Sequence, residues 1–539
     1  MAKLFYPDFF NDVFGPIMQP GSSGAFAGTS RVGRVAGSLV RGELGEIHFI
    51  FNKSEKVRFE QLGNMMEDRG YLGGTLGFST DDYRLFEAHK IARERKISYD
   101  FKLGESDNGY PKSLTIKIKS RDQEEGFLKG ASVGGGMIRI YEINGYSLNW
   151  QADTYGILVE IKDQAAIEQQ KAEFEKGQGN YHIQTQILQK DGEKPESSAY
   201  FIEVSKEPDV GNTDRAFEGQ KVTILPAVLP VVTTKQKKPQ LFKTVAEWRE
   251  VAEKQNISFV QAAIEYEKAS SGWTEEEIWE YFEKIADIFD KQIHALERMG
   301  YENAKDTPLL PIYGKLWKKY LDTQTPLSDT LTRHILTHAY AVNAKLPGVL
   351  IVPGPMGTGG GYLFSALDAV REESGFSHKR MIEALIVAAG LGALAYTHTN
   401  ATGEVGCVGE SGVCCAMASG AVAWLAGGDG IAVERAASMA LQANMGLCCD
   451  PIPGGLEFPC ITRTLRAAVT APMYAEMALA GIDPLIPYHE CLQAIEKHFR
   501  KVPNAFLCGG ECGCNCTPTA EKCRDFLQKQ MAGSLQYQA

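Results

Sequence analysis

The sequence has 539 residues, of which 44% are hydrophobic and 23% are charged, and its formal charge is −11 at pH 7. This length exceeds what one hydrophobic core usually supports, so we expect about two or three domains. The acidic balance argues against a surface for nucleic acid or for an anionic membrane, where Lys and Arg accumulate. No apolar run is long enough to span a bilayer, and Met1–Asp8 lacks the apolar segment of a signal peptide, so we expect a cytoplasmic protein without a membrane partner.

Residues 1–150 mix strand and helix patterns. Ile47–Phe51 is an apolar run rich in β-formers, and Ser113–Lys119 alternates with period two, as a half-buried strand does. The glycines of Ser132–Met137 indicate a bulge or a close approach of backbone within a strand. We therefore predict an α+β N-terminal domain over residues 1–150.

Residues 151–205 predict a small, regulatory-like α/β module of the ACT type. Strand-like and helix-like runs follow one another in the order Gly156–Ile161, Gln164–Lys176, Tyr181–Gln189 and Ala199–Val204. That order fits a small sheet with helices on one face. Residues 206–242 are rich in proline and carry the basic run Lys235–Lys238, which predicts a linker.

Residues 243–539 predict an all-α catalytic domain. Thr274–Glu277 is a capping-box signature, apolar residues follow it at helical spacing as far as Leu296, and Gly300 is a suitable stop. Further helices are predicted in the apolar, small-residue stretches Met381–Ala395, Ser411–Leu425 and Ala432–Met445.

Cysteine usage points to metal chemistry in this last domain. All 12 cysteines lie at or after Cys407. Concentration in one region of a large chain differs from a secreted disulfide scaffold and favours metal or cluster binding. The alternative is that small thiols only fill a helical core.

Two glycine-containing segments carry the most informative cysteines. Gly403–Glu410 contains Cys407, and Cys449–Cys460 begins and ends with cysteine. Backbone in such segments approaches a bulky cofactor and directs amides toward sulfur. Thiolates suit iron–sulfur clusters, and three of them leave one iron open, although this wide spacing is a modest signal by itself.

These segments resemble the α domain of the iron–sulfur-dependent L-serine dehydratases (L-serine ammonia-lyases), whose patterns are GxVGCQxE and CDPVxGLVxxPC. The glycine-rich loop Pro353–Tyr362 and the run Thr517-Pro518-Thr519 also resemble that domain. Three N-terminal segments resemble the family's β domain, namely Phe14–Met18, Arg31–Arg34 and Ser132–Met137. The resemblance implies a β domain, a small module and an α domain fused on one chain.

The resemblance implies a 4Fe–4S cluster held by Cys407, Cys449 and Cys460. The open iron would accept the hydroxyl of a small amino or hydroxy acid and stabilise its departure as a Lewis acid. A base removes the α proton, and the resulting enamine hydrolyses to an oxo acid and ammonia. The enzyme is expected to be an oxygen-sensitive lyase of amino acid metabolism.

The substrate contacts are predicted from the same resemblance. Ser22 and Ser23 lie in the loop that holds substrate in the family, where an anion-binding role assisted by Arg31 or Arg34 competes with a plain surface loop. The further predicted contacts are Thr358, Gly359, Gly360 and Asn400. Gly24-Ala25 stands where the family has His-Thr, and Asn64–Asp68 lacks a second family histidine. These departures put serine itself in question as the substrate.

The cysteine-rich tail exceeds the family pattern. In some relatives a C-terminal cysteine occupies the open iron, and Cys516 is the candidate for that role. Alternatively Cys512, Cys514 and Cys516 bind a second metal or remain free thiols. Glu404 and Asp450 flank predicted ligands and are expected to orient them.

Two histidine motifs have competing interpretations. His398 lies shortly before Cys407 and is the candidate general base, with a hydrogen-bonded structural histidine as the alternative. His334 and His338 are four residues apart and share a helical face. Such a pair can bind metal, but we expect a partly exposed amphipathic face.

Three functions remain open from the sequence. The leading prediction is an L-serine ammonia-lyase that forms pyruvate. The second is a lyase of the same fold acting on another β-substituted acid, such as a cysteine desulfidase. The third is an iron–sulfur or redox sensor, suggested by the tail and the regulatory-like module. Because small-residue helices and two-part sites often assemble across subunits, we expect a homodimer.

Overall fold

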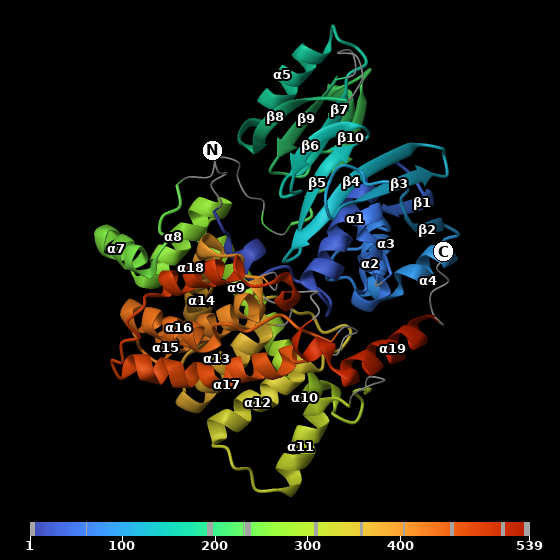
Figure 1. Cartoon of the computed structure of the whole chain (residues 1–539). Coiled ribbons are helices and arrows are strands. Elements are labelled where there is room, and N and C mark those ends of the chain that lie inside the picture. The colour runs from blue at the N-terminus through green and yellow to red at the C-terminus, as the bar shows by residue number, and fades with distance from the viewer. Residues whose placement is uncertain are drawn as a thin grey trace. The chain divides into compact units, whose positions relative to one another are not determined.

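The computed structural model describes residues 6–60, 62–190, 198–229, 231, 239–306, 311–355, 359–402, 405–452, 458–507 and 512–532. The chain forms two compact units (Figure 1). Unit 1 comprises Met1–Gly21 and Lys237–Gln530, and unit 2 comprises Ser22–Gln236 and Met531–Ala539. Unit 2 contains the sheets and unit 1 is helical, so the predicted order of an α/β N-terminal part and a helical C-terminal part is confirmed at this level.

The first residues of the chain belong to the helical unit, which differs from the predicted boundary at residue 1. A short π-helix, Phe9–Val13, is capped by Asp8 and packs its aromatic rings against unit 1. Phe9 stacks on Tyr266, and Phe14 makes an edge contact with Phe289. Phe9, Phe10 and Val13 are apolar and fully buried, so the segment belongs to the core of unit 1.

Unit 2 contains a six-stranded sheet of order β2-β1-β3-β4-β5-β6. Its strands are β1 (Leu44–Phe51), β2 (Ser98–Leu103), β3 (Leu114–Ser120), β4 (Glu125–Gly134), β5 (Met137–Ile143) and β6 (Tyr146–Trp150). β1 and β2 are parallel, and the other neighbours are antiparallel. The predicted strand at 113–119 is confirmed as β3, and its alternating burial follows its alternating sequence.

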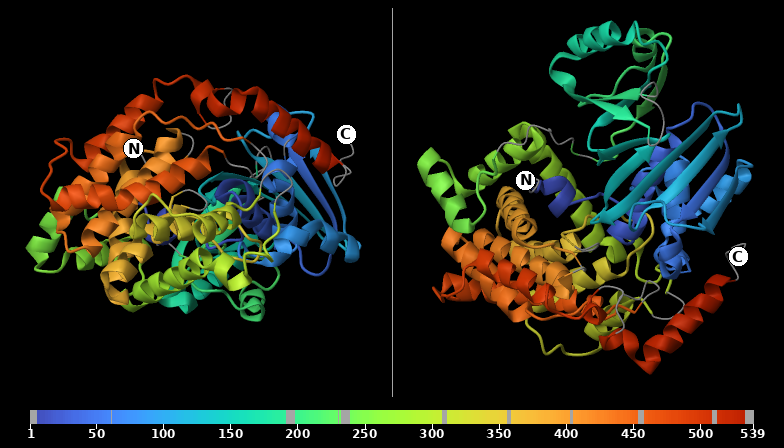
Figure 2. Two further views of the ribbon diagram at one scale, coloured as in Figure 1. Left: turned by 90° about the horizontal axis from the view of Figure 1, so that it is seen from below. Right: turned by 45° about the horizontal axis from the view of Figure 1, so that its top comes forward.

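Helices cover one face of this sheet, as the right-hand view of Figure 2 shows. They are α1 (Thr29–Gly37), α2 (Lys56–Phe59), α3 (Glu67–Thr75) and α4 (Ala88–Glu94). α1 packs on α3 and on the central strands β3, β4 and β5. The predicted bulge or close approach at 132–137 is also found, because the register shifts after Ser132 and the Ser132 hydroxyl donates to the carbonyl of Gly24 at 2.8 Å.

The second sheet of unit 2 is a βαββαβ arrangement with strand order β10-β7-β9-β8, all antiparallel. Its elements are β7 (Tyr155–Glu160), α5 (Ile167–Gln178), β8 (His182–Gln189), β9 (Ser198–Val204), α6 (Val210–Ala216) and β10 (Lys221–Leu225). Both helices share one core with one sheet face, in which Ile157, Ile202, Phe174 and Phe217 are buried. The three strands and the helix predicted before residue 205 are confirmed.

The predicted linker at 206–242 is corrected in its first half. α6 and β10 lie there, and β10 pairs with β7 from Lys221 to Leu225. The proline content of this segment suggested a linker, but Pro226 comes directly after β10 and does not interrupt it. The strand can therefore form its backbone hydrogen bonds with β7.

Unit 1 is built from helices that pack side by side around α15 (Figures 1 and 2). They are α7 (Val245–Gln255), α8 (Phe259–Ser271), α9 (Glu275–Ile293), α10 (Ala295–Met299), α11 (Tyr313–Thr323), α12 (Thr330–Asn343), α13 (Gly359–Ser374), α14 (His378–His398), α15 (Val413–Leu425), α16 (Gly430–Asn444), α17 (Cys460–Leu479), α18 (Tyr488–Phe499) and α19 (Pro518–Ala532). The predicted capping box is present, because the Thr274 and Glu277 side chains each bond the other's backbone amide.

Two helical stretches of unit 1 are long and apolar enough to cross a membrane by composition alone. They are His378–His398 and Val408–Leu425, and 78% and 89% of their apolar windows are buried in the protein. Ala and Gly make up much of both stretches, so neighbouring helices approach closely and exclude water from them. Burial of this extent fits core helices.

Candidate metal centre

Three cysteine-bearing segments meet in unit 1. Cys407 precedes the short helix Val408–Gly412 and α15, Cys449 follows α16, and Cys460 begins α17. The amide of Val408 donates to the carbonyl of Leu447 at 3.4 Å, which joins the first two segments. A hydrogen bond between the Cys407 and Cys460 side chains joins the first and third. We call this region, defined by Cys407, Cys449 and Cys460, the cysteine centre.

All three thiols of the cysteine centre are withdrawn from water. The residues are 2%, 5% and 9% exposed for Cys407, Cys449 and Cys460, in that order. The hydrogen bond with Cys460, a contact with Ser411 and the positive charge of Arg463 lower the pKa of the Cys407 thiol to about 6 against the effect of burial. A thiol with this pKa is mainly thiolate at neutral pH, which is the form that binds metal.

Arg463 connects the parts of the cysteine centre. It lies one turn after Cys460 on α17, and its guanidinium donates to the Cys448 carbonyl at 2.9 Å and to Asp450 Oδ1 at 2.7 Å. Its charge acts on Cys407 as well. One cation therefore holds the segment after α16 against α17 and faces the thiol of Cys407.

The cysteine-rich tail is docked on the same aspartate. The amide of Cys514 donates to Asp450 Oδ2 at 2.7 Å. Gly513 has φ +71°, and a Cβ there would lie 2.3 Å from Asp450 Oδ2, so glycine is required. Asp450 thus orients the tail and Arg463, whereas Glu404 lies outside the described residues.

Cys516 lies in this docked segment with its side chain exposed. Cys514 is also exposed, and Cys512 is half-buried. The role of Cys516 as a cluster ligand therefore stays a prediction.

The glycine-rich loop leads into α13. Gly359 and Gly360 are buried in its first turn, and Thr358 lies outside the described residues. The thiol of Cys414 on α15 donates to the Gly359 carbonyl at 3.3 Å. An added Cβ at Gly360 would lie 2.4 Å from the Phe289 ring, so close helix packing explains this glycine.

The segment after α14 brings Asn400 near the cysteine centre. A Cβ at Gly409, two residues after Cys407, would lie 3.2 Å from the Asn400 carbonyl. His398, at the end of α14, has its Nε2 2.6 Å from the Lys243 carbonyl and its Nδ1 3.5 Å from Gln493 Nε2. Burial lowers the pKa of His398. These contacts are compatible with a structural histidine, and the role of His398 as general base stays a prediction.

The serine loop belongs to unit 2. The Ser22 hydroxyl caps a short π-helix, Ser23–Gly28, by accepting from the Ala25 amide at 3.2 Å. Arg31 is buried and donates to the Gly136 carbonyl at 2.6 Å. Arg34 instead lines a cavity of about 830 Å³ together with other basic side chains, Arg95, Lys96 and Arg121.

One histidine of unit 2 was missed by the sequence analysis. Asn64–Asp68 contains no histidine, but His89 on α4 places its Nε2 2.7 Å from Asp68 Oδ2. The other ring nitrogen lies 3.0 Å from the Tyr99 hydroxyl. Asp68 is buried. A histidine therefore does lie beside Asn64–Asp68, but it comes from α4, a helix later in the chain.

The histidine pair of α12 was predicted to share a partly exposed face, and His334 is partly exposed whereas His338 is buried. His338 is 4% exposed and packs against His294 and His334. Burial and these neighbouring rings lower the pKa of His338 to about 3, so the ring is neutral. His334 lies 3.3 Å from Glu372 and 3.2 Å from Glu373. The face of α12 that carries His338 is buried by α9 and α13, which are distant from it in sequence.

Comparison with known proteins identifies the family. Residues 254–515 match the family described as serine dehydratase alpha chain. The chain is 28% identical over 302 residues to the probable L-serine dehydratase alpha chain of Bacillus subtilis, which covers 55% of this chain and 97% of that protein. It is 33% identical over 159 residues to the L-serine dehydratase beta chain of Peptoniphilus asaccharolyticus, with 29% and 69% covered. It is 45% identical over 96 residues to L-serine dehydratase 2 of Escherichia coli, with 18% and 21% covered.

These similarities are to lyases. The chain belongs to the L-serine dehydratase family, as the resemblance of its cysteine segments indicates. It is similar to both alpha and beta chains, which occur on separate polypeptides in Peptoniphilus asaccharolyticus.

Proposed function

We propose that this protein is an iron–sulfur-dependent L-serine ammonia-lyase that converts L-serine to pyruvate and ammonia. Family membership supports the reaction. The single structural observation that supports the cofactor is the meeting of three buried cysteine-bearing segments in unit 1. The reaction balances because loss of the α proton and the β-hydroxyl gives water and an enamine, which takes up water and releases ammonia.

The donors of the cysteine centre fit a 4Fe–4S cluster held by Cys407, Cys449 and Cys460. Soft thiolate ligands match iron–sulfur clusters, and the lowered pKa of Cys407 supplies such a ligand at neutral pH. Arg463 places a positive charge beside the sulfur, which stabilises the negative charge of a thiolate-bound cluster. When bound through three cysteines, such a cluster supplies an open iron that acts as a Lewis acid toward the leaving hydroxyl.

The chain's own residues orient this centre. Asp450 fixes Arg463 and the tail, and Ser411 contacts the sulfur of Cys407. Ser22, Ser23, Thr358, Gly359, Gly360 and Asn400 remain the proposed substrate contacts. His398 remains the proposed general base, and its Nε2 lies 2.6 Å from the Lys243 carbonyl in this structure.

Anaerobic assay of the full chain tests this function. The protein should release pyruvate from L-serine, and both activity and the brown colour should be lost in air. Cys449→Ser should lose iron and activity together. Cys491→Ser is the matched control, because Cys491 on α18 is also buried but contacts Ser438 on α16 and is no proposed ligand. A loaded cluster without turnover of L-serine would refute the substrate assignment.

A second candidate is elimination from another β-substituted amino or hydroxy acid. Gly24-Ala25 stands where the family resemblance expects His-Thr, so the polar groups around the substrate differ. Screening L-cysteine and small hydroxy acids beside L-serine separates the two candidates. If the protein turned over none of these acids but lost and regained its cluster reversibly, the result would favour the third interpretation, an iron–sulfur or redox sensor.

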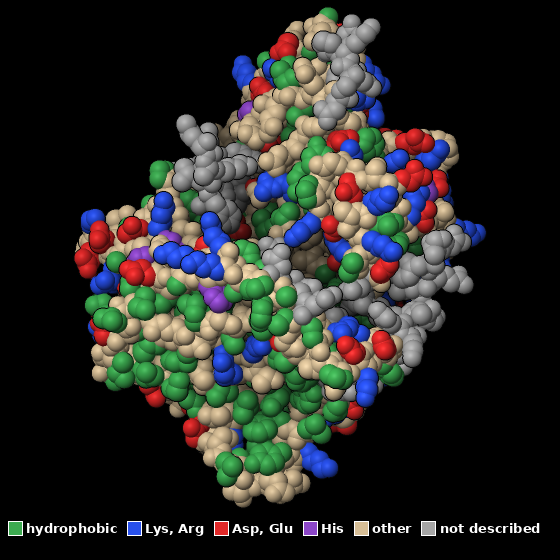
Figure 3. Space-filling model, in the orientation of Figure 1, with side chains coloured by type: hydrophobic (Ala, Val, Ile, Leu, Met, Phe, Trp, Pro, Cys, Tyr) green, Lys and Arg blue, Asp and Glu red, His purple; other side chains and the backbone are tan. Residues whose placement is uncertain are grey.

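We also propose a cytoplasmic homodimer. The acidic balance and the burial of both long apolar helices support a protein that binds neither nucleic acid nor membrane. Figure 3 shows hydrophobic side chains gathered on the face of the helical unit that α17 presents. Exposed apolar residues near its end are Met473, Leu479, Ile482, Leu485 and Ile486. Such patches mark interfaces, so light scattering should give two chains and Met473→Glu/Leu479→Glu should give one.

A further inference from the structure

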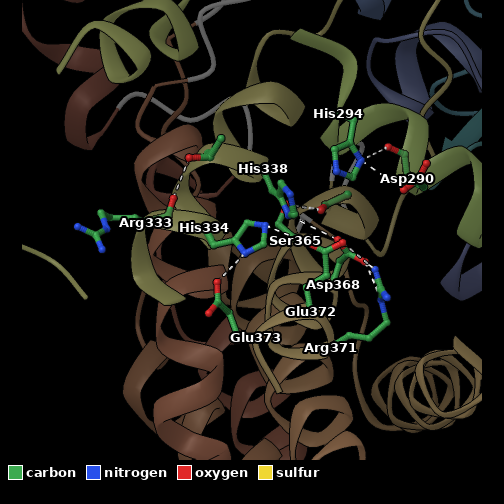
Figure 4. A network of polar contacts seen from close by, with 12 residues as sticks. Asp290, His294, Arg333, His334, His338, Ser365, Asp368, Arg371, Glu372 and Glu373 are labelled. Atoms are coloured by element: carbon green, nitrogen blue, oxygen red, sulfur yellow. Dashed lines mark hydrogen bonds and ion pairs between the residues drawn. The ribbon is translucent and has the colours of Figure 1, made fainter. Parts of the chain in front are cut away.

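Three polar side chains from three helices meet in the interior of unit 1. They are His294 at the end of α9, His338 on α12 and Asp368 on α13 (Figure 4). One ligand atom from each lies within 4.8 Å of the others. No cysteine takes part. We call these residues the His–Asp cluster.

Two atoms of the cluster are buried without a hydrogen-bond partner in the described part of the chain. They are His338 Nδ1 and Asp368 Oδ2. The side chains are 5% and 2% exposed, and the two atoms are 3.9 Å apart, which is too far for a hydrogen bond. Buried polar atoms are nearly always paired, because an unpaired one loses its hydration without compensation. This pair therefore requires a third group between the atoms.

The hydrogen bonds of the two rings leave lone pairs available to that group. The His338 ring bonds the backbone of Ser365, and because its Nδ1 has no partner, Nε2 is the nitrogen that donates. Nδ1 then carries the lone pair. Nδ1 of His294 lies 2.9 Å from the Asp290 carbonyl, so this nitrogen donates and Nε2 carries the lone pair. Histidines that bind metals are held in the same way, with the second ring nitrogen bonded to a carbonyl or carboxylate.

Asp368 is held for the same task. Arg371 donates to its Oδ1 at 3.0 and 2.7 Å, which fixes the carboxylate and leaves Oδ2 toward His338. The surrounding carboxylates, Asp290, Glu372 and Glu373, together with Asp368 outnumber the two guanidinium groups that pair with them, those of Arg298 and Arg371. The local charge balance therefore admits a divalent cation.

We propose that His294, His338 and Asp368 bind a divalent transition-metal ion, Zn²⁺, at a site built from different residues than the cysteine centre. Two imidazoles and one carboxylate suit Zn²⁺, whereas hard cations prefer oxygen and soft ones prefer sulfur. A water would complete four-coordination. The ion ties the end of α9 to α12 and α13, and α13 begins at the buried glycines Gly359 and Gly360. Its role is to fix the helix that carries the glycine-rich loop.

Elemental analysis and Co²⁺ substitution of the full chain test this site. Anaerobically purified protein should contain one zinc per chain in addition to its iron. After the zinc is removed with a chelator, Co²⁺ should restore one equivalent and give visible d–d absorption without sulfur-to-cobalt charge transfer. That spectrum separates nitrogen and oxygen ligands from the thiolates of the cysteine centre.

Variants make the test decisive. Asp368→Asn keeps the shape of a buried side chain, and His294→Ala changes a half-buried edge of the site, so the test does not rest on the core position alone. Both should lose the zinc and the Co²⁺ spectrum while retaining iron. His378→Ala, an exposed histidine paired with Glu283, should change neither.

Equal Co²⁺ binding by wild type and Asp368→Asn would overturn the proposal. So would a charge-transfer spectrum or wild-type protein that takes up no zinc when Zn²⁺ alone is added. In that last case an enclosed water, and no metal, bridges His338 and Asp368.

Discussion

The cysteine centre and the His–Asp cluster lie in the same helical unit but are built in different ways. The cysteines lie on turns and helix ends, and a docked tail and Arg463 support them. The His–Asp cluster instead lies on the inward faces of α12 and α13 and the end of α9. Ligands on turns and helix ends leave room for a cofactor and a substrate, whereas ligands on packed helices hold those helices together. The arrangement of the cysteine centre therefore suits a catalytic site, and that of the His–Asp cluster suits a structural metal site.

Loss of one cysteine should have the largest effect. In Cys407→Ser the weaker oxygen ligand should fail to hold the cluster, and pyruvate release should fall more than about 100-fold. Iron content, read on the same anaerobic sample, should fall with it while zinc remains at one per chain. Persistence of iron with full activity would remove Cys407 from the cysteine centre.

Removal of zinc should have the next largest effect, and on stability alone. A zinc-selective chelator should lower the free energy of unfolding by about 3 kcal/mol at zinc concentrations near 100 times the dissociation constant. Differential scanning calorimetry should show the midpoint fall, with cluster absorption unchanged. Asp368→Asn should already have the lower midpoint and should not respond. If the chelator lowered the midpoint of wild type and of Asp368→Asn equally, it would be acting at a site other than the His–Asp cluster.

Gly513→Ala should loosen the tail. The added Cβ meets Asp450 and the backbone conformation is left-handed, so docking should weaken by about 1–3 kcal/mol. Hydrogen exchange at the Cys514 amide should accelerate. Gly481→Ala is the matched control, because that glycine also has a positive φ, +86°, but an added Cβ meets nothing within 4 Å. If hydrogen exchange at the Cys514 amide were unchanged in Gly513→Ala, the contact with Asp450 would not be what holds the tail.

Arg463→Gln should have the smallest effect, on the pH dependence of Cys407. Removing the positive charge should raise the thiol pKa from about 6 toward its ordinary value of 9.0, so alkylation of cluster-free protein should require higher pH. In wild type the folded state has the lower pKa. The thiolate therefore adds stability above pH 9.0 that is lost as the pH falls toward 6. Arg435→Gln, which breaks a surface pair with Asp483, should leave the profile unchanged.

Periodic patterns predicted much of the fold. The capping box at Thr274 and the strands β7, β8 and β9 follow from local sequence, because caps and alternation act over a few residues. β10 was missed, since a five-residue strand depends on its pairing with β7. The placement of Phe9–Val13 in unit 1 was also missed, because only tertiary contacts decide which core an apolar segment joins.

The cysteine centre and the His–Asp cluster also differ in how far local sequence predicts them. Glycine-flanked cysteines mark the cysteine centre in the sequence, although the contact of Asp450 with the tail does not show there. His294, His338 and Asp368 have no shared motif, and only the crossing of α9, α12 and α13 brings them together. The burial of His338, in a pair predicted to share a partly exposed face, depends on the same crossing.

Iron and sulfide analysis of the wild-type chain purified under nitrogen is the most direct measurement of all. We predict brown protein with about four iron and four sulfide per chain, and Cys407→Ser, Cys449→Ser and Cys460→Ser that each fall well below this content. A colourless wild-type preparation without iron would contradict the cysteine centre as a cluster site.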